Sequence, residues 1–181
     1  MAILPVIVAP DARLKVVSEP VAAVDAEIRR LMDDLLETMY DAPGVGLAAP
    51  QVGAAKRVIV VDVAREGEAA KPLCMANPRL IAASDETAVY EEGCLSLPEQ
   101  YAEVRRPARC TVAYLDYDGA ERRLDAEGLL ATCVQHEMDH LDGILFVDHI
   151  SKIKRDLILR RLAKQRRMRP EKVRAPAAHV L

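Results

Sequence analysis

Apolar residues recur along this chain at two spacings, one that predicts helices and one that predicts strands. Helical spacing begins after Asp25, a suitable N-cap, and continues to about Tyr40. We expect this apolar stripe to pack into the core; it consists of Ile28, Leu31, Leu35, Leu36 and Met39. A second helix is predicted over residues 127–141, stopped near Gly143, with apolar positions at Leu129, Leu130, Cys133, Val134 and Leu141.

Strand signals fill much of the chain between these two helices. Residues 57–63 form a β-branched run that is typical of a buried strand. Asp118-Gly119 is a strong hairpin signal between candidate strands at 110–117 and 120–124. Shorter strands are expected at 73–75, 79–83, 87–91 and 146–147, whereas residues 4–20 are expected to form an extended lead-in interrupted by prolines.

A last helix is predicted to begin after Ser151 and to extend to Met168. Its basic residues should face outward and its apolar residues inward, the latter being Ile153, Leu157, Ile158 and Leu162. Helices set against antiparallel strands indicate an α+β fold. We expect one domain over residues 1–181, with antiparallel strands around the central helix at 127–141, helices at both ends, and a basic helix and tail over 151–181.

Composition narrows the class of protein. The 181 residues are 51% hydrophobic, and no apolar run approaches the ~20 residues that cross a bilayer. The N-terminus lacks the basic leader and small-residue cleavage site of a secretion signal. The four cysteines are unevenly spaced, so reduced thiols in a cytoplasmic protein are a simpler interpretation than a disulfide framework.

Charge is distributed unequally along the chain. The formal net charge is −3, but residues 1–150 hold 14 Lys and Arg against 26 Asp and Glu, a balance of −12. Residues 151–181 hold 11 basic residues against two acidic ones, a balance of +9. Such asymmetry favours a polyanionic partner for the C-terminal segment, although a solvated helix without a partner has the same composition.

The strongest chemical motif is the sequence HEMDH. His136 and His140 are four residues apart, so on a helix both imidazoles lie on one face and can reach one metal ion. Glu137 is then placed beside a water bound to the metal, which favours metal-dependent hydrolysis. The alternative is a pair of solvated histidines, because H-E-x-x-H also occurs by chance.

Spacing alone does not identify a third ligand, which a catalytic site usually has. The extended motif H-E-x-x-H-x-x-G-x-x-H fails because position 146 is Phe146, and His149 comes three residues too late. Cys133 lies about 7–8 Å along the helix axis from the metal, too far for a cysteine side chain. The remaining candidates are Cys74, Cys94, Cys110 and the acidic residues.

Residues 44–53, GVGLAAPQVG, form a glycine-rich segment with a single polar side chain, Gln51. Its start imitates a dinucleotide-binding loop, but that loop follows a strand and opens a helix, whereas this one follows a helix and meets Pro50. We therefore expect no nucleotide cofactor. The segment is either a wall where backbone and an amide approach a ligand, or a plain turn with a surface glutamine.

Three segments together resemble, in order and spacing, the signature segments of bacterial peptide deformylases: GVGLAAPQVG at 44–53, EGCLSLP at 92–98 and QHEMDHLDG at 135–143. The similarity extends to PDARL near the N-terminus and to DAEGLLA at 125–131. The resemblance implies that Cys94 joins His136 and His140 as the third metal ligand. The implied reaction is hydrolysis of the formyl group from formyl-methionine at the start of new polypeptides, with release of formate.

The resemblance also implies a role for each group around the metal. Glu137 would accept a proton from the attacking water, whose pKa the metal lowers towards ~7, and pass it to the leaving amine. The donors to the developing oxyanion would be the side-chain amide of Gln51 and the backbone N–H of Leu95. Gly46 matches the glycine beside the bound peptide, and Glu92 is expected to pair with a buried basic group or with backbone amides.

The methionine side chain requires an apolar pocket. On the metal helix, residues seven, four and three positions before His136 share its face, and with two residues from elsewhere they form the candidate pocket: Val45, Tyr90, Leu129, Thr132 and Cys133. Ordinary core packing explains each of them equally well. Some relatives carry a substrate-contacting arginine at the position of Tyr101, and that contact does not carry over.

Metal identity and partner follow from the same resemblance. A thiolate with two imidazoles suits iron(II) or zinc, and the family is thought to use iron(II) in cells, with zinc, nickel or cobalt also able to occupy the site. Relatives dock on the ribosome through their C-terminal helix, so we expect the basic segment 151–181 to bind there. The alternatives are a metallopeptidase of the H-E-x-x-H type and a non-enzymatic, ribosome-associated metal-binding protein.

Overall fold

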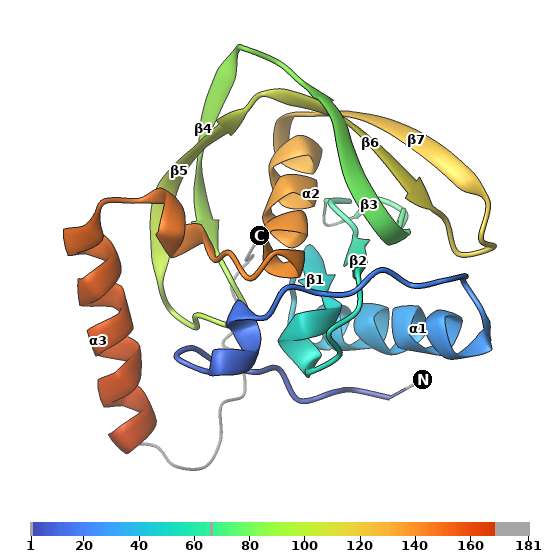
Figure 1. Cartoon of the computed structure of the whole chain (residues 1–181). Helices are drawn as coiled ribbons and strands as arrows, with labels where there is room; N and C mark the ends of the chain where they lie inside the picture. The colour runs from blue at the N-terminus through green and yellow to red at the C-terminus, as the bar shows by residue number, and fades with distance from the viewer. Residues whose placement is uncertain (1, 66, 169–181) are drawn as a thin grey trace.

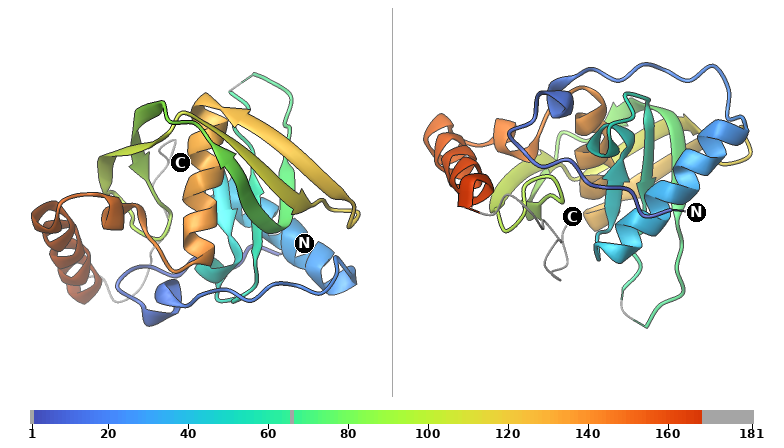
Figure 2. Two further views of the ribbon diagram at one scale, coloured as in Figure 1. Left: turned by 45° about the horizontal axis from the view of Figure 1, so that its top comes forward. Right: turned by 90° about the horizontal axis from the view of Figure 1, so that it is seen from below.

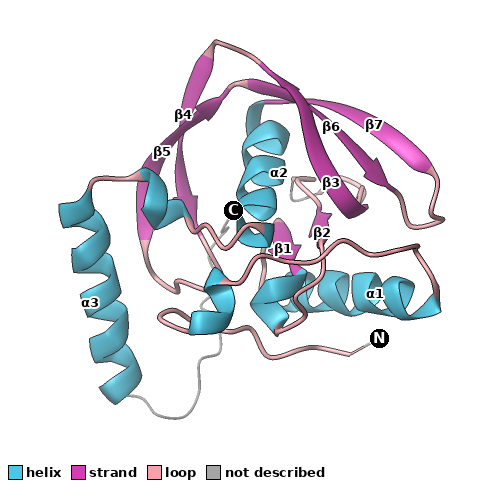
Figure 3. Cartoon of the chain, viewed as in Figure 1, coloured by secondary structure: helices cyan, strands magenta, loops and turns pink. Residues whose placement is uncertain are grey.

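Two antiparallel sheets and three α-helices make up the fold in the computed structural model, which describes residues 2–65 and 67–168. The predicted tail from residue 169 onward lies outside these residues. The larger sheet has the order β1-β2-β3-β6-β7, and β4 pairs with β5 separately (Figure 3). The strands are β1 Gly46–Ala48, β2 Val58–Val61, β3 Leu73–Ala83, β4 Thr87–Gly93, β5 Tyr101–Pro107, β6 Arg109–Leu115 and β7 Glu121–Glu127.

Helix α2, Gly128–Leu141, runs through the centre of the molecule with strands around it (Figure 1). It follows β7 without a loop and ends at Leu141, with Asp142 as its C-cap, before Gly143 adopts a φ of 70°. Gly143 has no room for a side chain, because a Cβ atom would lie 2.6 Å from the backbone oxygen of Lys15. The prediction of an α+β fold with a central helix is confirmed.

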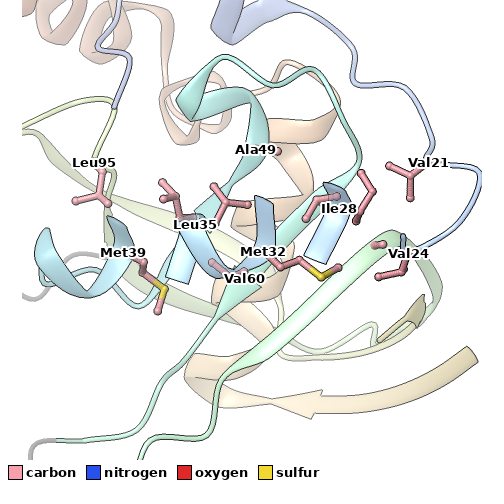
Figure 4. Packing of buried hydrophobic residues seen from close by; sticks show 12 residues of the cluster. Val21, Val24, Ile28, Met32, Leu35, Met39, Ala49, Val60 and Leu95 are labelled. Carbon is pink, nitrogen blue, oxygen red and sulfur yellow. The ribbon is translucent and has the colours of Figure 1, made fainter. Parts of the chain in front are cut away.

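Helix α1, Ala26–Asp41, begins as predicted, because the Asp25 carboxylate accepts hydrogen bonds from the backbone N–H groups of Glu27 and Ile28. Its buried face packs on β2 in a cluster that Figure 4 shows. Met32 belongs to this face although it was not predicted, whereas Leu31 and Leu36 are only partly buried.

Strand β2 is covered on both faces, which accounts for its unbroken apolar sequence. Val58 and Val60 belong to the cluster around α1, whereas Ile59 and Val61 belong to the cluster that includes α2. Alternate side chains of a strand point to opposite faces, so each face packs against a different helix. The sheet therefore holds α2 in position from one side.

Helix α3, Lys152–Met168, lies on the opposite side of the molecule from α1 (Figures 1 and 2). Ile158 and Leu162, four residues apart, are buried against Phe146 and the lead-in. The prediction that Ile153 and Leu157 also face inward is wrong, since they are 76% and 48% exposed. At 3.6 residues per turn they lie roughly 140° and 100° from Ile158, outside the narrow contact stripe.

Four local predictions need correction. Segments 73–75 and 79–83 are one strand, β3, which passes through an irregularity at Asn77, a residue with a φ of 50°. Residues 146–147 belong to the 3-10 helix η3, Phe146–His149, instead of a strand. The lead-in contains the 3-10 helix η1, Ala12–Lys15. The segment 44–53 is not only a loop, since it forms β1 and the 3-10 helix η2, Ala49–Val52.

The N-terminal lead-in contacts all three signature segments through backbone hydrogen bonds. Ile7 N–H donates to the oxygen of Gln51 at 2.7 Å, and Ala9 N–H donates to that of Ser96 at 2.8 Å. Ser18 N–H donates to the oxygen of Leu141 at 2.7 Å.

Among the described residues, none of the helices combines the length and the hydrophobicity needed to span a membrane.

Candidate metal centre and active site

Three ligand atoms from two distant segments converge at one buried point. Cys94 directly follows β4, and His136 and His140 lie one turn apart on α2. The cysteine sulfur and one nitrogen from each ring all lie within 4.8 Å of one another, and Cys94 Sγ is 3.3 Å from His140 Nε2. Cys74 on β3 and Cys110 on β6 lie outside this group. The described cysteines are all free, as predicted.

The donor set fits a metal ion. His136 Nδ1 donates to Glu92 Oε2 at 2.8 Å, so Nε2 is the ring atom that would bind a metal. Although burial alone would lower the pKa of His136, its contacts with Cys94 and Glu92 raise that pKa well above its ordinary value, so a metal would displace a proton from Nε2. That Nε2 atom is buried and has no hydrogen-bond partner among the described residues. Burial lowers the pKa of His140 well below its ordinary value, so this ring stays neutral and keeps a lone pair for a metal.

Glu137 is buried beside this group. Its Oε2 atom has no hydrogen-bond partner among the described residues. Burial raises the pKa of Glu137 to about 7, close to the value expected for a general base at neutral pH. Gly46 on β1 packs against this carboxyl so closely that a Cβ there would lie 2.8 Å from Glu137 Cδ and 2.9 Å from Cys133 Sγ.

The Gln51 amide is held in one orientation. Its Oε1 accepts the backbone N–H of Ala48 at 2.8 Å, so its Nε2 points towards Cys94 Sγ, 3.4 Å away, and Ser96 Oγ, 3.1 Å away. Leu95 follows Cys94, and its side chain is buried in the cluster around α1 (Figure 4). Two amide groups therefore flank the cysteine, one from η2 and one from the backbone after it.

Glu92 pairs with buried basic groups, as expected. Besides His136, it binds Arg106 through two hydrogen bonds of 2.6 and 3.0 Å. Although burial alone would raise the pKa of Glu92, the hydrogen bonds to His136 and Arg106 hold it at about 2. Arg106 NH1 also donates to Asp139 Oδ2, which accepts from His149 Nε2.

Sequence reasoning missed Arg106, Asp139 and His149. The available signals were weak. Asp139 occupies a position that the H-E-x-x-H motif does not specify, and Arg106 lies among other charged residues in β5, YAEVRRP. A strand sequence with three charged residues among seven predicts solvent exposure, yet Arg106 is buried. Arg106 is buried because it pairs with the buried carboxylate of Glu92.

The candidate pocket residues are buried to different degrees. Cys133 is fully buried, with its sulfur 3.4 Å from the backbone oxygen of Val45. Thr132 is buried and donates to its own helix, at the oxygen of Gly128. Leu129 is 37% exposed, and Tyr90 is half-buried with its hydroxyl oxygen near Gly128. Tyr101, at 40% exposure, begins β5.

The site combines a cysteine with the two histidines and the buried carboxyl of an H-E-x-x-H helix. These groups define a metal-dependent hydrolase. A family model described as polypeptide deformylase matches residues 3–156. The chain belongs to the peptide deformylase family. It is an enzyme that hydrolytically removes the N-terminal formyl group of polypeptides, and the family depends on a metal.

Individual relatives support this assignment over nearly the whole chain. The peptide deformylase of Rhizobium meliloti (strain 1021) is 58% identical over 172 residues, covering 95% of this chain and 99% of the relative. That of Phenylobacterium zucineum (strain HLK1) is 58% identical over 164 residues, covering 91% and 97%. Neither alternative function is favoured by these comparisons.

Solved structures show the same fold. The peptide deformylase of Ehrlichia chaffeensis in complex with actinonin has a TM-score of 0.88 at 44% identity, covering 92% of this chain and 99% of that one. The enzyme of Legionella pneumophila has a TM-score of 0.87 at 41% identity, covering 94% and 99%.

Proposed function

We propose that Cys94, His136 and His140 hold the metal and that Glu137 is the general base of deformylation. The observation that carries this proposal is the convergence of three ligand atoms within 4.8 Å, beside a carboxyl oxygen with no hydrogen-bond partner among the described residues. When bound, the metal supplies Lewis acidity and lowers the pKa of water towards ~7. The reaction requires a water molecule as nucleophile, and Glu137 would take its proton.

Glu137 moves the proton in each direction. As water oxygen bonds to the formyl carbon, Glu137 Oε2 accepts the water's proton and becomes neutral. The carbon–nitrogen bond then breaks, and the same carboxyl donates its proton to the departing nitrogen, which gives formate and a free N-terminal amine. A pKa of about 7 suits both steps, because the group accepts and donates a proton with similar ease near neutrality.

Gln51 and Leu95 stabilise the negative charge on the formyl oxygen. The Gln51 side-chain Nε2 lies 3.4 Å from Cys94 Sγ, and the backbone N–H of Leu95 belongs to the residue after Cys94, so the two donors come from different parts of the chain. Both are fixed before substrate binds, Gln51 by its bond from Ala48 and Leu95 by its buried side chain. Removing one such donor typically costs ~10²–10³ in rate.

The substrate is formyl-methionine at the start of a new polypeptide. Its side chain occupies an apolar pocket formed by Val45, Gly46, Tyr90, Leu129 and Cys133, with Thr132 at its edge. Support comes from Leu129, which remains partly exposed on the helix face that carries His136, and from Tyr90 close to Gly128 at the start of that helix. The reaction takes place in the cytoplasm, where new chains emerge.

The deciding experiment compares the wild-type enzyme with Glu137→Ala and Glu137→Gln on a formyl-Met dipeptide. Wild type should release formate and leave the dipeptide bond intact, whereas both variants should lose at least ~10²-fold in rate because they lack the base. Metal content per chain should stay unchanged, since Glu137 is not a ligand. Full activity in Glu137→Ala, or cleavage of unformylated Met peptides, would contradict the proposal.

Iron(II) is the metal that we propose for the working enzyme, with zinc, nickel or cobalt able to occupy the same site. A thiolate and two imidazoles suit each of these ions, and zinc generally binds more tightly than iron. Protein loaded with iron without oxygen should deformylate formyl-Met peptides much faster than the zinc form, and air should inactivate it as Cys94 or iron is oxidised. Equal rates for the two metal forms would count against iron.

A further inference from the structure

A continuous chain of polar contacts extends from the metal centre to the surface. His136 contacts Glu92 at 2.8 Å, and Glu92 binds Arg106 at 2.6 and 3.0 Å. Arg106 NH1 donates to Asp139 Oδ2 at 2.8 Å, and the same oxygen accepts from His149 Nε2 at 2.7 Å. Each contact joins groups of opposite character, so the chain has no like-charged neighbours in direct contact.

Arg106 is the rigid centre of this chain. Its Nε and NH2 atoms bind Glu92 and its NH1 atom binds Asp139, so every guanidinium nitrogen has a carboxylate partner. The planar guanidinium transmits orientation, because rotating it to follow one carboxylate breaks its contact with the other. Glu92 is completely buried, so it cannot replace Arg106 with solvent.

His149 holds the outer end of the chain. Its side chain is 33% exposed and belongs to η3, while Asp139 belongs to α2. Asp139 Oδ2 accepts two hydrogen bonds on one oxygen, from Arg106 and from His149, so the His149 contact limits where this oxygen can lie. Without it, Asp139 can turn towards solvent and release one side of the guanidinium.

We propose that His149 is a positioning residue for the metal centre, acting through Asp139, Arg106 and Glu92 on the orientation of the His136 ring. This inference rests on the proposed metal-binding role of Cys94, His136 and His140. Outer partners of metal ligands fix ring orientation and typically contribute ~10–100-fold to metal affinity. His149 stands further out, so its removal should have an effect at the lower end of that range.

The test measures zinc release from the full-length zinc enzyme into excess chromophoric chelator. His149→Ala should release zinc about 10-fold faster than wild type. His149→Gln should restore release to near the wild-type rate, because its amide N–H can donate to Asp139 from a similar distance. Asp148→Asn is the matched control, since it alters the same 3-10 turn through Lys15, Leu145 and Arg155 without contacting Asp139.

Each outcome decides the inference. Faster release in His149→Ala with rescue by His149→Gln and no change in Asp148→Asn supports it. Wild-type release in His149→Ala overturns it while leaving the proposed function intact, provided that wild type holds one zinc per chain. Equal acceleration in Asp148→Asn also overturns it, because the effect then comes from loosening the turn. A wild-type enzyme that binds no zinc overturns both the inference and the proposed ligand set.

Discussion

Gly46 shows how one residue limits what the active site can contain. Its backbone lies against the carboxyl of Glu137 and the sulfur of Cys133, both on α2, and the absence of a side chain allows this approach. No positive φ is involved, so the requirement is purely one of space. Glu137 is therefore confined between β1 and its own helix.

Replacing Gly46 with alanine should displace Glu137. The new Cβ would lie 2.8 Å from Glu137 Cδ, closer than nonbonded carbon atoms approach, and the carboxyl must move away. A displacement of about 1 Å at a catalytic group can cost ~10²-fold in rate. We expect kcat for formate release to fall by about this factor while the metal content stays at the wild-type value.

Gly44→Ala provides the control for this prediction. It changes a glycine of the same segment, but none of the atoms nearest to its Cβ belongs to Glu137 or Cys133. The single tight contact, 3.1 Å, is with Cδ1 at the flexible end of the Leu95 side chain, which can turn without moving the Leu95 backbone N–H. We expect near wild-type kcat for Gly44→Ala. Comparable losses in both variants would indicate that the segment, and not contact with Glu137, is responsible.

At this scale the sequence predicts local chemistry better than long-range pairing. Helical spacing is enough to place His136 and His140 on one face, because only the backbone geometry of a single element is involved. It left Cys74, Cys94 and Cys110 equivalent, since the choice depends on which strand end meets α2; only the family resemblance distinguished Cys94. Arg106 escaped prediction for the same reason, because its partners lie on β4 and α2.

At the scale of elements, Asp148 fastens three segments together. Its carboxylate accepts from the N–H of Leu145, the residue before η3, and it pairs with Lys15 of the lead-in and with Arg155 of α3. Although partial burial alone would raise the pKa of Asp148, the hydrogen bonds from Lys15 and from Leu145 lower it below its ordinary value. The charged form is therefore favoured in the folded enzyme.

Asp148→Asn should lower the stability of the fold at neutral pH and should make that stability depend less on pH in the acid range. Because the pKa of Asp148 is lower in the folded enzyme than in the unfolded chain (~3.9), its carboxylate stabilises the fold at pH values above ~3.9. This stabilisation is lost as the pH falls through the pKa of the folded state. We expect a loss of about 1 kcal/mol at pH 7, modest because Lys15 and Arg155 are partly exposed.

Urea unfolding of both proteins in the same metal form measures this difference. The gap between wild type and Asp148→Asn should persist from pH 7 to pH 5 and shrink below about pH 4, as the wild-type carboxyl takes up its proton. A gap that stays constant down to pH 3 would show that the ionised carboxylate is not the stabilising species.

Elements with local signals were predicted well, and those determined by tertiary packing were not. The Asp25 cap and the Asp118-Gly119 turn depend on neighbouring residues, and both occur in the structure, where Gly119 has a φ of 81°. Strand β5 was missed because three of its seven residues are charged and it is held by pairing with β4. Too many residues of α3 were predicted to face inward, because the spacing of apolar residues does not show how little of that helix packs against the rest of the protein.

At the scale of the whole molecule, α3 carries a basic surface, whereas residues 1–150 are acidic overall. It lies away from α1 (Figure 2), and its exposed side chains include Lys152, Lys154, Arg160, Arg161 and Lys164. Ile153 and Leu157 are exposed between them, so this face offers both charge and apolar area. We propose that this face binds the ribosome.

Charge reversal on this face should weaken ribosome binding and spare catalysis. Deleting the helix is a poor test, because Ile158 and Leu162 belong to the core. The variant Lys152→Glu, Lys154→Glu, Arg161→Glu should instead reduce affinity at least ~10-fold in co-sedimentation and flatten its salt dependence, since fewer phosphates are neutralised. Formate release from a dipeptide should stay at the wild-type rate.

A control with Arg30→Glu, Lys56→Glu and Arg79→Glu makes the same change of net charge on the body of the enzyme. These three side chains are exposed and distant in sequence from α3. Its ribosome affinity should fall much less than that of the α3 variant. Equal weakening by both variants would mean that overall charge, and not this face, governs binding.

The lead-in has a consequence for how the enzyme comes into being. Residues made first find their hydrogen-bond partners only in segments made much later, near positions 51, 96 and 141. The contact between Ser18 and Leu141 closes the longest of these loops, so the strap cannot be complete before α2 has been made. Docking of this strap and assembly of the catalytic centre thus both require α2, and a newborn copy of the enzyme stays inactive until that helix has been made.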